Sequence, residues 1–259
     1  MSERSTSPIR PIALITGASR GLGRSMALSL AQRGWDLVIT YRERADQADT
    51  LRQEVEALGG RLVALALDVG QAGQFPGFAA QVEAALQAQW GGRRLQALVN
   101  NAGVGIYAPL AELTEAQFDA LVAVHLKGPF FLTQALLPLL ADGGRIVNIS
   151  SGLTRFSLPG YGAYASMKGA IEVFTRYLAK ELGARGIAVN TVAPGAIETD
   201  FGGAAVRDQP EVKAFIASQT ALGRAGVPED IGPMVASLLS PDQRWVNAQR
   251  IEVSGGMFL

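Results

Sequence analysis

The feature that most constrains the fold of this 259-residue chain is a regular alternation of short apolar runs with longer amphipathic stretches. Seven runs are continuously apolar, as is typical of strands buried on both faces of a sheet. The stretches between them have helical length. This alternation predicts an α/β fold, with a doubly wound sheet of seven parallel strands, helices on both faces and right-handed crossovers. The expected strands are Ile12–Thr16, Leu37–Thr40, Leu62–Leu67, Leu95–Val99, Ile146–Ile149, Ile187–Val192 and Arg250–Val253.

Nothing in the sequence divides the chain into two folding units. Without an internal repeat or linker, residues 9–259 are predicted to form a single domain, preceded by a flexible tail at residues 1–8. The rhythm breaks at about 195–226, where we expect a lid or binding loop for substrate, with a plain surface excursion as the alternative. The predicted helices are Ser25–Arg33, Ala45–Leu58, Phe78–Gln89, Glu115–Leu140, Ala163–Leu182 and Pro210–Gln219.

Composition excludes several kinds of site. The chain has no cysteine and one histidine, which excludes disulfides and thiolate chemistry and argues against a histidine metal site. Its formal net charge is zero and its basic residues are scattered, so no nucleic-acid surface is expected. No apolar run approaches the roughly 18 residues of a membrane span, and the first residues lack the apolar core of an export signal. We therefore expect a cytoplasmic protein that binds neither metal, nucleic acid nor membrane.

A glycine-rich loop leads from the first predicted strand into the first helical pattern. Its spacing is Gly-x3-Gly-x-Gly, with no Gly-Lys-Ser/Thr that would indicate a nucleoside-triphosphatase loop. Glycines bring backbone close to a ligand, and the N-terminus of the next helix attracts phosphate. A turn that only joins strand to helix is the alternative. The order of elements favours a pyrophosphate site in a Rossmann fold, formed by Gly17, Ser19, Arg20, Gly21, Leu22 and Gly23.

The end of the second predicted strand distinguishes two nicotinamide cofactors. An acidic residue at this place accepts from the ribose 2′-hydroxyl of NAD, whereas an arginine suits the 2′-phosphate of NADP. Here Tyr41 takes the acidic position and Arg42 follows, and Arg20 can reach the same phosphate. NADP(H) is therefore favoured over NAD(H). The nearby Glu43, and the interpretation of Arg42 as a solvated surface residue, count against this prediction.

A tyrosine and a lysine stand four residues apart in a predicted helix. Tyr164 and Lys168 would share one helix face, and a nearby positive charge lowers a tyrosine pKa from its usual value of about 10. Ser151 lies upstream and can hold the oxygen of a carbonyl or alcohol. The spacing alone is common on exposed helices. Together with the cofactor loop it indicates proton transfer in carbonyl–alcohol chemistry.

With these motifs in this order, the chain resembles the short-chain dehydrogenase/reductase family from about Ile9 to Leu259, and most of all its 3-oxoacyl-carrier-protein-reductase-like branch. The resemblance implies that Ser151, Tyr164 and Lys168 are catalytic. It also implies further cofactor contacts. Asp68 and Val69 would contact the adenine, and Asn100, Ala102 and Gly103 of the Asn100-Asn101-Ala102-Gly103 motif would line the cofactor. Pro194, Gly195, Ile197 and Thr199 would lie over the nicotinamide. Tyr164 and Lys168 would also touch the cofactor.

Taken singly, several of these residues would be ordinary turn or cap residues. Asp68, Ser151, Gly103 and Pro194 are types that turns commonly contain. Nearly all of the matched positions, however, follow the carboxyl ends of predicted strands, where open α/β sheets bind their ligands. Their convergence on one edge favours the functional interpretation.

One position departs from the family pattern. The family usually has an asparagine in a segment like Val-Asn-Leu-Lys-Gly, and this chain has His125 there. In the family that asparagine helps hold a water that links the lysine to solvent, partly through its backbone. An imidazole can donate and accept hydrogen bonds, and its reference pKa near 6.5 suits a proton shuttle. A working variant relay is expected; the alternatives are a weakened enzyme and a cofactor-binding protein without turnover.

The predicted function is NADP(H)-dependent interconversion of a ketone or aldehyde and an alcohol by hydride transfer. Ser151 would hold the carbonyl oxygen and Tyr164 would donate or accept the proton. Lys168 would lower the tyrosine pKa and bind the nicotinamide ribose. A 3-oxoacyl thioester substrate is implied by the resemblance alone. The alternatives are a nucleotide-sensing or scaffold protein on the same fold and an NAD-dependent secondary-alcohol dehydrogenase.

Substrate and partners are less constrained by the sequence. A small carbonyl or alcohol substrate is expected, and the resemblance also implies a homo-oligomer, a tetramer or dimer, formed through Glu115–Leu140 and Ala163–Leu182. A face buried within the molecule would produce the same helical pattern. Apolar candidates for the pocket wall, each of which could equally pack in the core or a loop, are Leu153, Phe156, Leu158, Tyr161 and Phe201.

Overall fold

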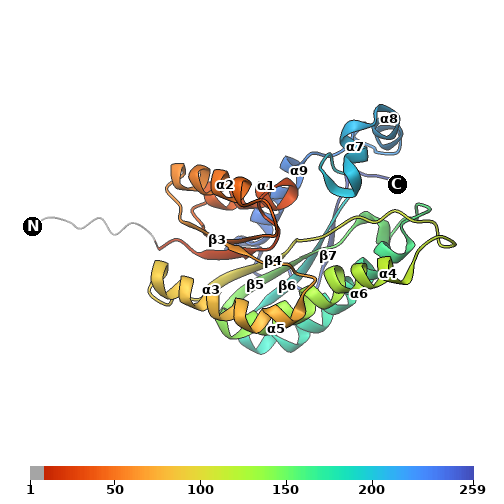
Figure 1. Cartoon of the computed structure of the whole chain (residues 1–259). Helices are drawn as coiled ribbons and strands as arrows, with labels where there is room; N and C mark the ends of the chain where they lie inside the picture. Colours follow the sequence, from red (N-terminus) through yellow and green to blue (C-terminus); the bar gives the residue numbers. More distant parts are fainter. Residues whose placement is uncertain (1–8) are drawn as a thin grey trace, which may run out of the picture.

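The computed structural model describes residues 9–259, so the tail predicted at residues 1–8 lies outside the described residues. One sheet of seven strands runs in the order β3-β2-β1-β4-β5-β6-β7, and every neighbouring pair is parallel (Figure 1). The chain order reverses between β1 and β4, which makes their carboxyl ends the topological switch point. The strands are β1 (Ile12–Ile15), β2 (Asp36–Tyr41), β3 (Leu62–Ala66), β4 (Leu95–Asn100), β5 (Leu140–Ile149), β6 (Ala188–Pro194) and β7 (Arg250–Val253).

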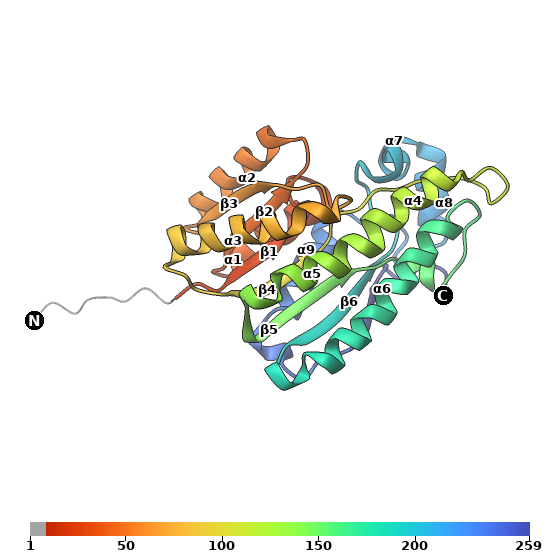
Figure 2. The same ribbon diagram turned by 60° about the horizontal axis from the view of Figure 1, so that its bottom comes forward.

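Helices cover both faces of this sheet, so the predicted doubly wound fold is confirmed (Figures 1 and 2). On one face lie α1 (Gly21–Gln32), α2 (Ala45–Ala57) and α9 (Pro228–Leu238), a helix that the sequence pattern had not singled out. On the other lie α3 (Phe75–Trp90), α5 (Gly128–Leu136) and α6 (Gly162–Glu181). Single 3-10 turns occur at Ala72–Gln74, Leu137–Leu139, Gly152–Thr154, Gly183–Arg185 and Pro241–Gln243.

The predicted helix Glu115–Leu140 is divided into parts. α4 (Glu115–Val122) begins with a capping box at Thr114 and passes into a π-helical turn at Ala123–Lys127, after which α5 begins. A π turn adds one residue to the helical repeat and rotates the side chains that follow. It therefore changes which residues face the active-site edge, and His125 lies within it.

The same helical stretch corrects the expectation that nothing in the chain has membrane-span character. Among the described residues, Glu115–Leu139 is the one helix whose length and mean hydropathy of 1.4 are sufficient to cross a bilayer. In this fold one side of it faces inward, where Leu121, Leu132 and Leu136 are almost fully buried.

Strand ends agree with the predictions to within two residues, except in β5. This strand starts at Leu140, not at Ile146, because Leu140 pairs with Leu95 before a register irregularity, and Arg145 then pairs with Ala97. Helix α1 also begins earlier than predicted, at Gly21 inside the glycine loop. Apolar patterning does not detect either extension, since Asp142, Gly143, Gly144 and Arg145 interrupt the apolar run of β5, and Gly21, Gly23 and Arg24 leave only Leu22 apolar at the start of α1.

The segment at 195–226 is helical in its middle part. It contains a 3-10 turn (Phe201–Ala204), α7 (Ala205–Asp208) and α8 (Pro210–Ser218), so the helix expected at Pro210–Gln219 is confirmed. Its apolar residues Ile216 and Ala225 are buried against Met257 near the end of the chain. The segment therefore packs on the C-terminal residues at the carboxyl edge of the sheet (Figure 1).

Candidate active site

The glycine loop crosses the end of β1 in a conformation that requires glycine. Gly17 has φ of +63°, and a Cβ on Gly23 would lie 2.5 Å from the Gly17 carbonyl oxygen and 2.7 Å from Ala18 Cα. The loop is also fastened to β2, because Gly17 N donates to Thr40 Oγ1 at 3.0 Å and Ala18 N to the Thr40 carbonyl at 3.0 Å. The backbone of the first turn of α1 thus lies directly against the strand ends.

Asn101 and Thr16 join this loop to β4. The Asn101 amide donates to the carbonyls of Thr16 at 2.8 Å and Gly17 at 3.1 Å. In return, Thr16 Oγ1 accepts from the backbone of Asn101 at 2.9 Å and of Ala102 at 3.0 Å. Asn101 was not among the predicted site residues, although it stands in the recognised Asn-Asn-Ala-Gly motif, which was the signal that could have identified it.

The N-terminus of α1 fits a pyrophosphate group. Its cap residue, Arg20, makes no side-chain capping bond, and the first turn contains no acidic residue. The first N–H groups of a helix have no intrahelical partner, and the helix dipole favours an anion there. Together with the close-packed Gly17 and Gly23, this end of α1 has the donor set and the backbone exposure that a dinucleotide needs.

Two exposed arginines lie where a 2′-phosphate is expected, and both are ion-paired. Arg42 Nη2 lies 2.9 Å from Glu43 Oε1, and Arg20 Nη1 lies 3.2 Å from Asp200 Oδ2. Tyr41, at the end of β2, is half-buried. Exposed ion pairs of this kind contribute about 0–1 kcal/mol, so a phosphate dianion can compete for either guanidinium.

The other predicted cofactor residues lie along the same edge but not all face outward. The Asp68 carboxylate accepts from Gly70 N at 2.9 Å, beside the nearly buried Val69. The Asn100 side chain points into the protein, where it donates to Thr133 Oγ1 at 3.0 Å and Asn148 Oδ1 at 2.8 Å. The Asn100 side chain therefore supports the sheet from within.

The structure brings Tyr164, Lys168 and Ser151 together beneath the edge of the sheet. Tyr164 and Lys168 lie on α6 and are 7% and 6% exposed. Lys168 Nζ donates to the Ile149 carbonyl at 2.8 Å, at the end of β5, and lies 5.6 Å from the centre of the Tyr164 ring. Ser151 begins the turn after β5, and its Oγ accepts from Leu153 N at 3.2 Å.

Burial controls the pKa values of this pair. It raises the pKa of the Tyr164 phenol, while hydrogen bonding with the Ser151 side chain opposes the shift. It also lowers the pKa of the Lys168 ammonium to about 7. The net shift of the Tyr164 pKa is therefore upward, the opposite of the lowering expected from Lys168, because desolvation of the phenolate is the largest effect.

His125 lies beside this pair and is almost completely buried. Its Nε2 lies 2.7 Å from the Val104 carbonyl oxygen, which favours the tautomer with the proton on Nε2, and its ring meets the Tyr164 ring edge-on with centres 5.1 Å apart. Burial first, and then the charge of Lys168, lower the pKa of His125 to about 3. The imidazole is therefore neutral at physiological pH. The expectation that His125 keeps a pKa near 6.5, as a proton shuttle would need, is not met.

The segment predicted to cover the nicotinamide runs from the end of β6 to the glycine loop. Gly195 N donates to the Val253 carbonyl at 3.1 Å, just after Pro194 at the end of β6. Ile197 forms a bridge with Gly226, which closes the 195–226 segment at its base. Thr199 lies against Gly21, within 4 Å of the position that a Cβ would take there. The four predicted residues thus lie between β6 and the cofactor loop.

Aromatic residues lie near Tyr164, and we refer to three of them, Tyr107, Tyr161 and Phe201, as the mouth of the site. The rings of Tyr107 and Tyr161 meet edge-on with centres 5.4 Å apart, and Phe201 lies 5.6 Å from the Tyr164 ring. Leu153 packs in the cluster that contains Tyr164. Among the apolar pocket candidates, Phe156 instead packs on Phe258, with ring centres 4.8 Å apart, and so belongs to the packing of the C-terminal segment. Tyr107 was not predicted and is the additional aromatic residue of this wall.

No cluster of three or more metal-ligating side chains occurs in residues 9–259. A doubly wound sheet with a phosphate-binding turn at its switch point, and with Ser151, Tyr164 and Lys168 gathered at the carboxyl edge, defines a dinucleotide-dependent oxidoreductase. The comparison with known proteins narrows this class. The family model described as enoyl-(acyl carrier protein) reductase matches residues 17–258, and the chain belongs to the short-chain dehydrogenase/reductase family.

Individual relatives extend over nearly the whole chain. An uncharacterized oxidoreductase of Methylorubrum extorquens is 40% identical over 246 residues, which cover 95% of this chain and 97% of the relative. A hydroxynaphthalene reductase-like protein of Metarhizium brunneum is 36% identical over 256 residues, covering 95% and 94%. The crystal structure of the angucycline C-6 ketoreductase LanV with bound NADP has a TM-score of 0.90 and 38% identity, covering 96% of this chain and 95% of LanV. The protein is thus an oxidoreductase that interconverts carbonyl and hydroxyl groups with a nicotinamide cofactor.

Proposed function

We propose that the protein is an NADPH-dependent ketoreductase that acts on planar ketones conjugated or fused to aromatic rings. The observation that carries the proposal is the burial of Tyr164 beside Ser151 and Lys168, under a mouth formed by Tyr107, Tyr161 and Phe201. Bound NADPH supplies the hydride. The protein supplies the proton, the orientation of the ketone and the exclusion of water.

The proton chemistry assigned to the side chains favours reduction. The Tyr164 phenol, whose pKa is raised by burial, is protonated at neutral pH and can donate to the carbonyl oxygen. The Ser151 hydroxyl holds the same oxygen and stabilises the negative charge that develops on it. Lys168, anchored on the Ile149 carbonyl, supports the tyrosine from below and binds the nicotinamide ribose.

The choice of NADPH over NADH rests on the end of β2 and on the glycine loop. Tyr41 replaces the acidic residue that would accept from a ribose 2′-hydroxyl, Arg42 follows it and is exposed, and Arg20 in the glycine loop is also exposed. LanV, which is similar along its whole length, was crystallised with NADP. We expect at least about tenfold tighter binding of NADPH than of NADH, as one charge-assisted phosphate contact would provide. Tryptophan-fluorescence titration of both cofactors measures the difference.

The substrate class rests on the aromatic wall. Flat rings stack favourably on tyrosine and phenylalanine side chains, whereas a flexible acyl chain gains less from them. Two relatives carry names that refer to fused aromatic substrates, the hydroxynaphthalene reductase-like protein and the angucycline ketoreductase. An acyl thioester, the substrate implied by the family branch, is the competing assignment.

A carbonyl panel tests this function. NADPH oxidation is followed with 2-tetralone and a hydroxynaphthalenone, and in parallel with an acetoacetyl thioester and a short aliphatic ketone. We expect kcat/KM to be at least about tenfold higher for the fused-ring ketones, since stacking contributes about 1 kcal/mol or more. A preference for the thioester would overturn the substrate class while preserving the ketoreductase.

Tyr164→Phe tests the assignment of the proton donor. The variant retains the ring and loses only the hydroxyl, so NADPH binding should stay within about twofold while kcat falls by at least about 100-fold, the range of general acid catalysis. A stopped assay with 2-tetralone measures kcat. If the variant turns over at the wild-type rate, Tyr164 is not the proton donor. If the wild-type protein reduces no ketone of the panel, a nucleotide-binding protein without turnover is favoured.

We also propose that the protein forms a homo-oligomer through α5 and α6. Phe130 and Phe131 on α5 and Val173 and Tyr177 on α6 are more than one-third exposed, and Phe130 stacks on Phe174 across the two helices with ring centres 4.6 Å apart. A continuous aromatic surface of this kind commonly marks a protein interface. Its occupant is proposed to be the same face of a second copy.

A further inference from the structure

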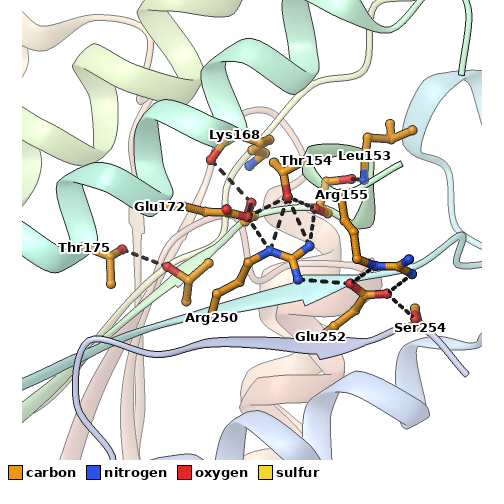
Figure 3. A network of polar contacts seen from close by, with 12 residues as sticks. Leu153, Thr154, Arg155, Lys168, Glu172, Thr175, Arg250, Glu252 and Ser254 are labelled. Atoms are coloured by element: carbon orange, nitrogen blue, oxygen red, sulfur yellow. Dashed lines mark hydrogen bonds and ion pairs between the residues drawn. The ribbon is translucent and has the colours of Figure 1, made fainter. Parts of the chain in front are cut away.

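A polar network joins α6 to β7 directly beneath the serine turn (Figure 3). At its centre is Glu172, which follows Lys168 by one helical turn and therefore faces the same side of α6. Its Oε1 accepts from Ser150 Oγ at 2.7 Å, from Thr154 Oγ1 at 2.7 Å and from Arg250 Nε at 2.8 Å. The Glu172 side chain is only 14% exposed.

Arg250 carries the network to the backbone of the serine turn. Its Nη2 donates to the Ser151 carbonyl at 3.3 Å and to Thr154 Oγ1 at 3.0 Å. Thr154 Oγ1 also lies 2.9 Å from the same Ser151 carbonyl oxygen. The residue before Ser151 is thus held by Glu172, and the peptide group of Ser151 itself is held by Arg250 and Thr154.

The far end of the turn is fastened in the same way. Arg155 donates to Glu252 at 2.6 and 2.8 Å, and to the Met257 carbonyl at 2.6 Å. Glu252 in turn accepts from Arg250 Nη1 at 3.0 Å. The turn from Ser150 to Arg155 is therefore clamped between the helix that carries Tyr164 and Lys168 and the last strand of the sheet.

The Ser151 hydroxyl itself makes few hydrogen bonds. Within the described residues its hydrogen-bond partners are Leu153 N, which belongs to the same turn, and Tyr164, whose pKa it influences. The place of the hydroxyl therefore follows from where the backbone of the turn is held. A displacement of about 1 Å in a catalytic group can cost on the order of 100-fold in rate.

We propose that Glu172 and Arg250 are positioning residues that set the Ser151 hydroxyl against Tyr164. The inference rests on the proposed function of that site. A partly buried carboxylate–guanidinium pair contributes little net stability, since desolvation offsets its attraction. Its geometric effect is specific, because a single carboxylate oxygen connects the turn, the catalytic helix and β7.

A double-mutant cycle tests the proposal. Glu172→Gln retains size and an acceptor oxygen but removes the charge, and it is made both in the wild type and in Ser151→Ala. We expect about a tenfold fall in kcat for 2-tetralone, with KM and the NADPH dissociation constant within about twofold, and no further fall in the Ser151→Ala background. Equal fold losses in both backgrounds would assign Glu172 a role unrelated to Ser151 and overturn the proposal. If Ser151→Ala has no measurable turnover, the Glu172→Gln variant alone decides. A fall in kcat with KM and the NADPH dissociation constant unchanged supports the proposal, and a change mainly in KM or in that dissociation constant overturns it.

Asp142→Asn is the matched control. It removes a carboxylate that pairs with an arginine, Arg185, at the opposite end of the same strand, β5, where Asp142 is 77% exposed. Turnover of this variant should equal that of the wild type. Arg250→Lys keeps the charge and loses the forked donor, so it should reproduce the effect of Glu172→Gln in weaker form, and it replaces that variant if Glu172→Gln does not fold.

A second measurement is independent of turnover and separates failure of this inference from failure of the proposed function. Amide hydrogen exchange of peptides covering residues 150–156 should be faster in Glu172→Gln than in wild type and unchanged in Asp142→Asn. Unchanged exchange in Glu172→Gln would show that the network does not hold the turn. If the wild type reduces no ketone of the panel, the function is wrong and this exchange comparison still decides whether Glu172 and Arg250 hold Ser151.

Discussion

At the scale of single residues, the active site brings together titratable groups whose charged forms are disfavoured by burial. Tyr164 and Lys168 lie in the same buried space, and desolvation shifts the two pKa values in opposite directions, up for the phenol and down for the ammonium. His125, between them and the Val104 carbonyl, is also kept neutral. The site is therefore prepared to donate a proton from a neutral phenol in water-poor surroundings.

Replacing Lys168 should change how stability depends on pH. The pKa of Lys168 is about 7 in the folded protein and about 10.5 when unfolded. Between these values the unfolded chain binds more protons, so the free energy of unfolding should rise as pH increases from about 7 to about 10. Lys168→Met should remove this rise and abolish turnover. Urea denaturation at pH 7 and pH 9.5 measures the slope, with the exposed Lys127→Met as the control that should keep it.

His125→Asn should change how stability depends on pH in the acidic range. The pKa of His125 is about 3 when folded and about 6.5 when unfolded, so the unfolded chain binds more protons in this window and stability falls as pH drops from about 6.5 to about 3. The asparagine variant should lose that dependence. The wild-type rate should also lack a limb due to His125 between pH 5 and 8. Denaturation and rate profiles of both proteins against pH measure these effects. A change in the wild-type rate near pH 6.5 that is absent from the variant would show that His125 does act as a proton shuttle.

At the scale of elements, the sequence predicts what repeats and misses what is irregular. Continuous apolar runs locate all seven strands, and Gly17, Gly21 and Gly23 locate the cofactor loop. Strand order and the π turn that holds His125 follow from tertiary packing, which local periodicity does not encode. The direction of the Tyr164 pKa shift likewise depends on burial, which spacing to Lys168 alone does not specify.

The last strand provides a test of acid stability. Glu252 on β7 is hydrogen-bonded first of all by Arg155, and also by Ser254 and Arg250, which lower its pKa to about 2. Because the unfolded carboxylate has a pKa near 4.5, its contribution is present above that pH and lost as pH falls from about 4.5 to about 2.

Glu252→Gln should therefore flatten the loss of stability in this acidic window. At neutral pH it should cost about 1–2 kcal/mol, a value reduced for solvent screening because Arg155 is partly exposed. Chemical denaturation between pH 2.5 and 7 measures both effects. Glu83→Gln, at an exposed position of α3, should have neither. An unchanged acid limb in Glu252→Gln would mean that the ion pair does not persist in solution.

At the scale of the whole molecule, α5 and α6 lie on the side of the sheet opposite α1, α2 and α9 (Figure 2). Phe130 and Phe131 on α5 and Val173 and Tyr177 on α6 are exposed on this face. The active-site edge lies at the ends of the strands, away from the middle of this face. Association through it would leave the cofactor loop and the 195–226 segment accessible.

Phe130→Lys tests the oligomer. A lysine at the centre of the aromatic face would bring an unpaired charge into the interface, so the mass in solution should fall to that of a smaller species at micromolar concentration. Light scattering after gel filtration measures the mass. Leu58→Lys, at a residue of equal exposure (42% for both) at the end of α2, should leave the mass unchanged. A monomeric wild type would contradict the proposal outright.

The contact between Arg20 and Asp200 also limits how coenzyme preference can evolve. Arg20 lies in the glycine loop and pairs with Asp200 in the 195–226 segment, and Asp200 also pairs with Arg207 of the same segment. Arg42 pairs only with its neighbour Glu43 among the described residues. With both arginines at the 2′-phosphate, as proposed, a lineage that exchanged Arg42 would change its coenzyme preference and leave the 195–226 segment undisturbed. A lineage that exchanged Arg20 would also lose the contact with that segment, so we expect the two arginines to be replaced at different rates.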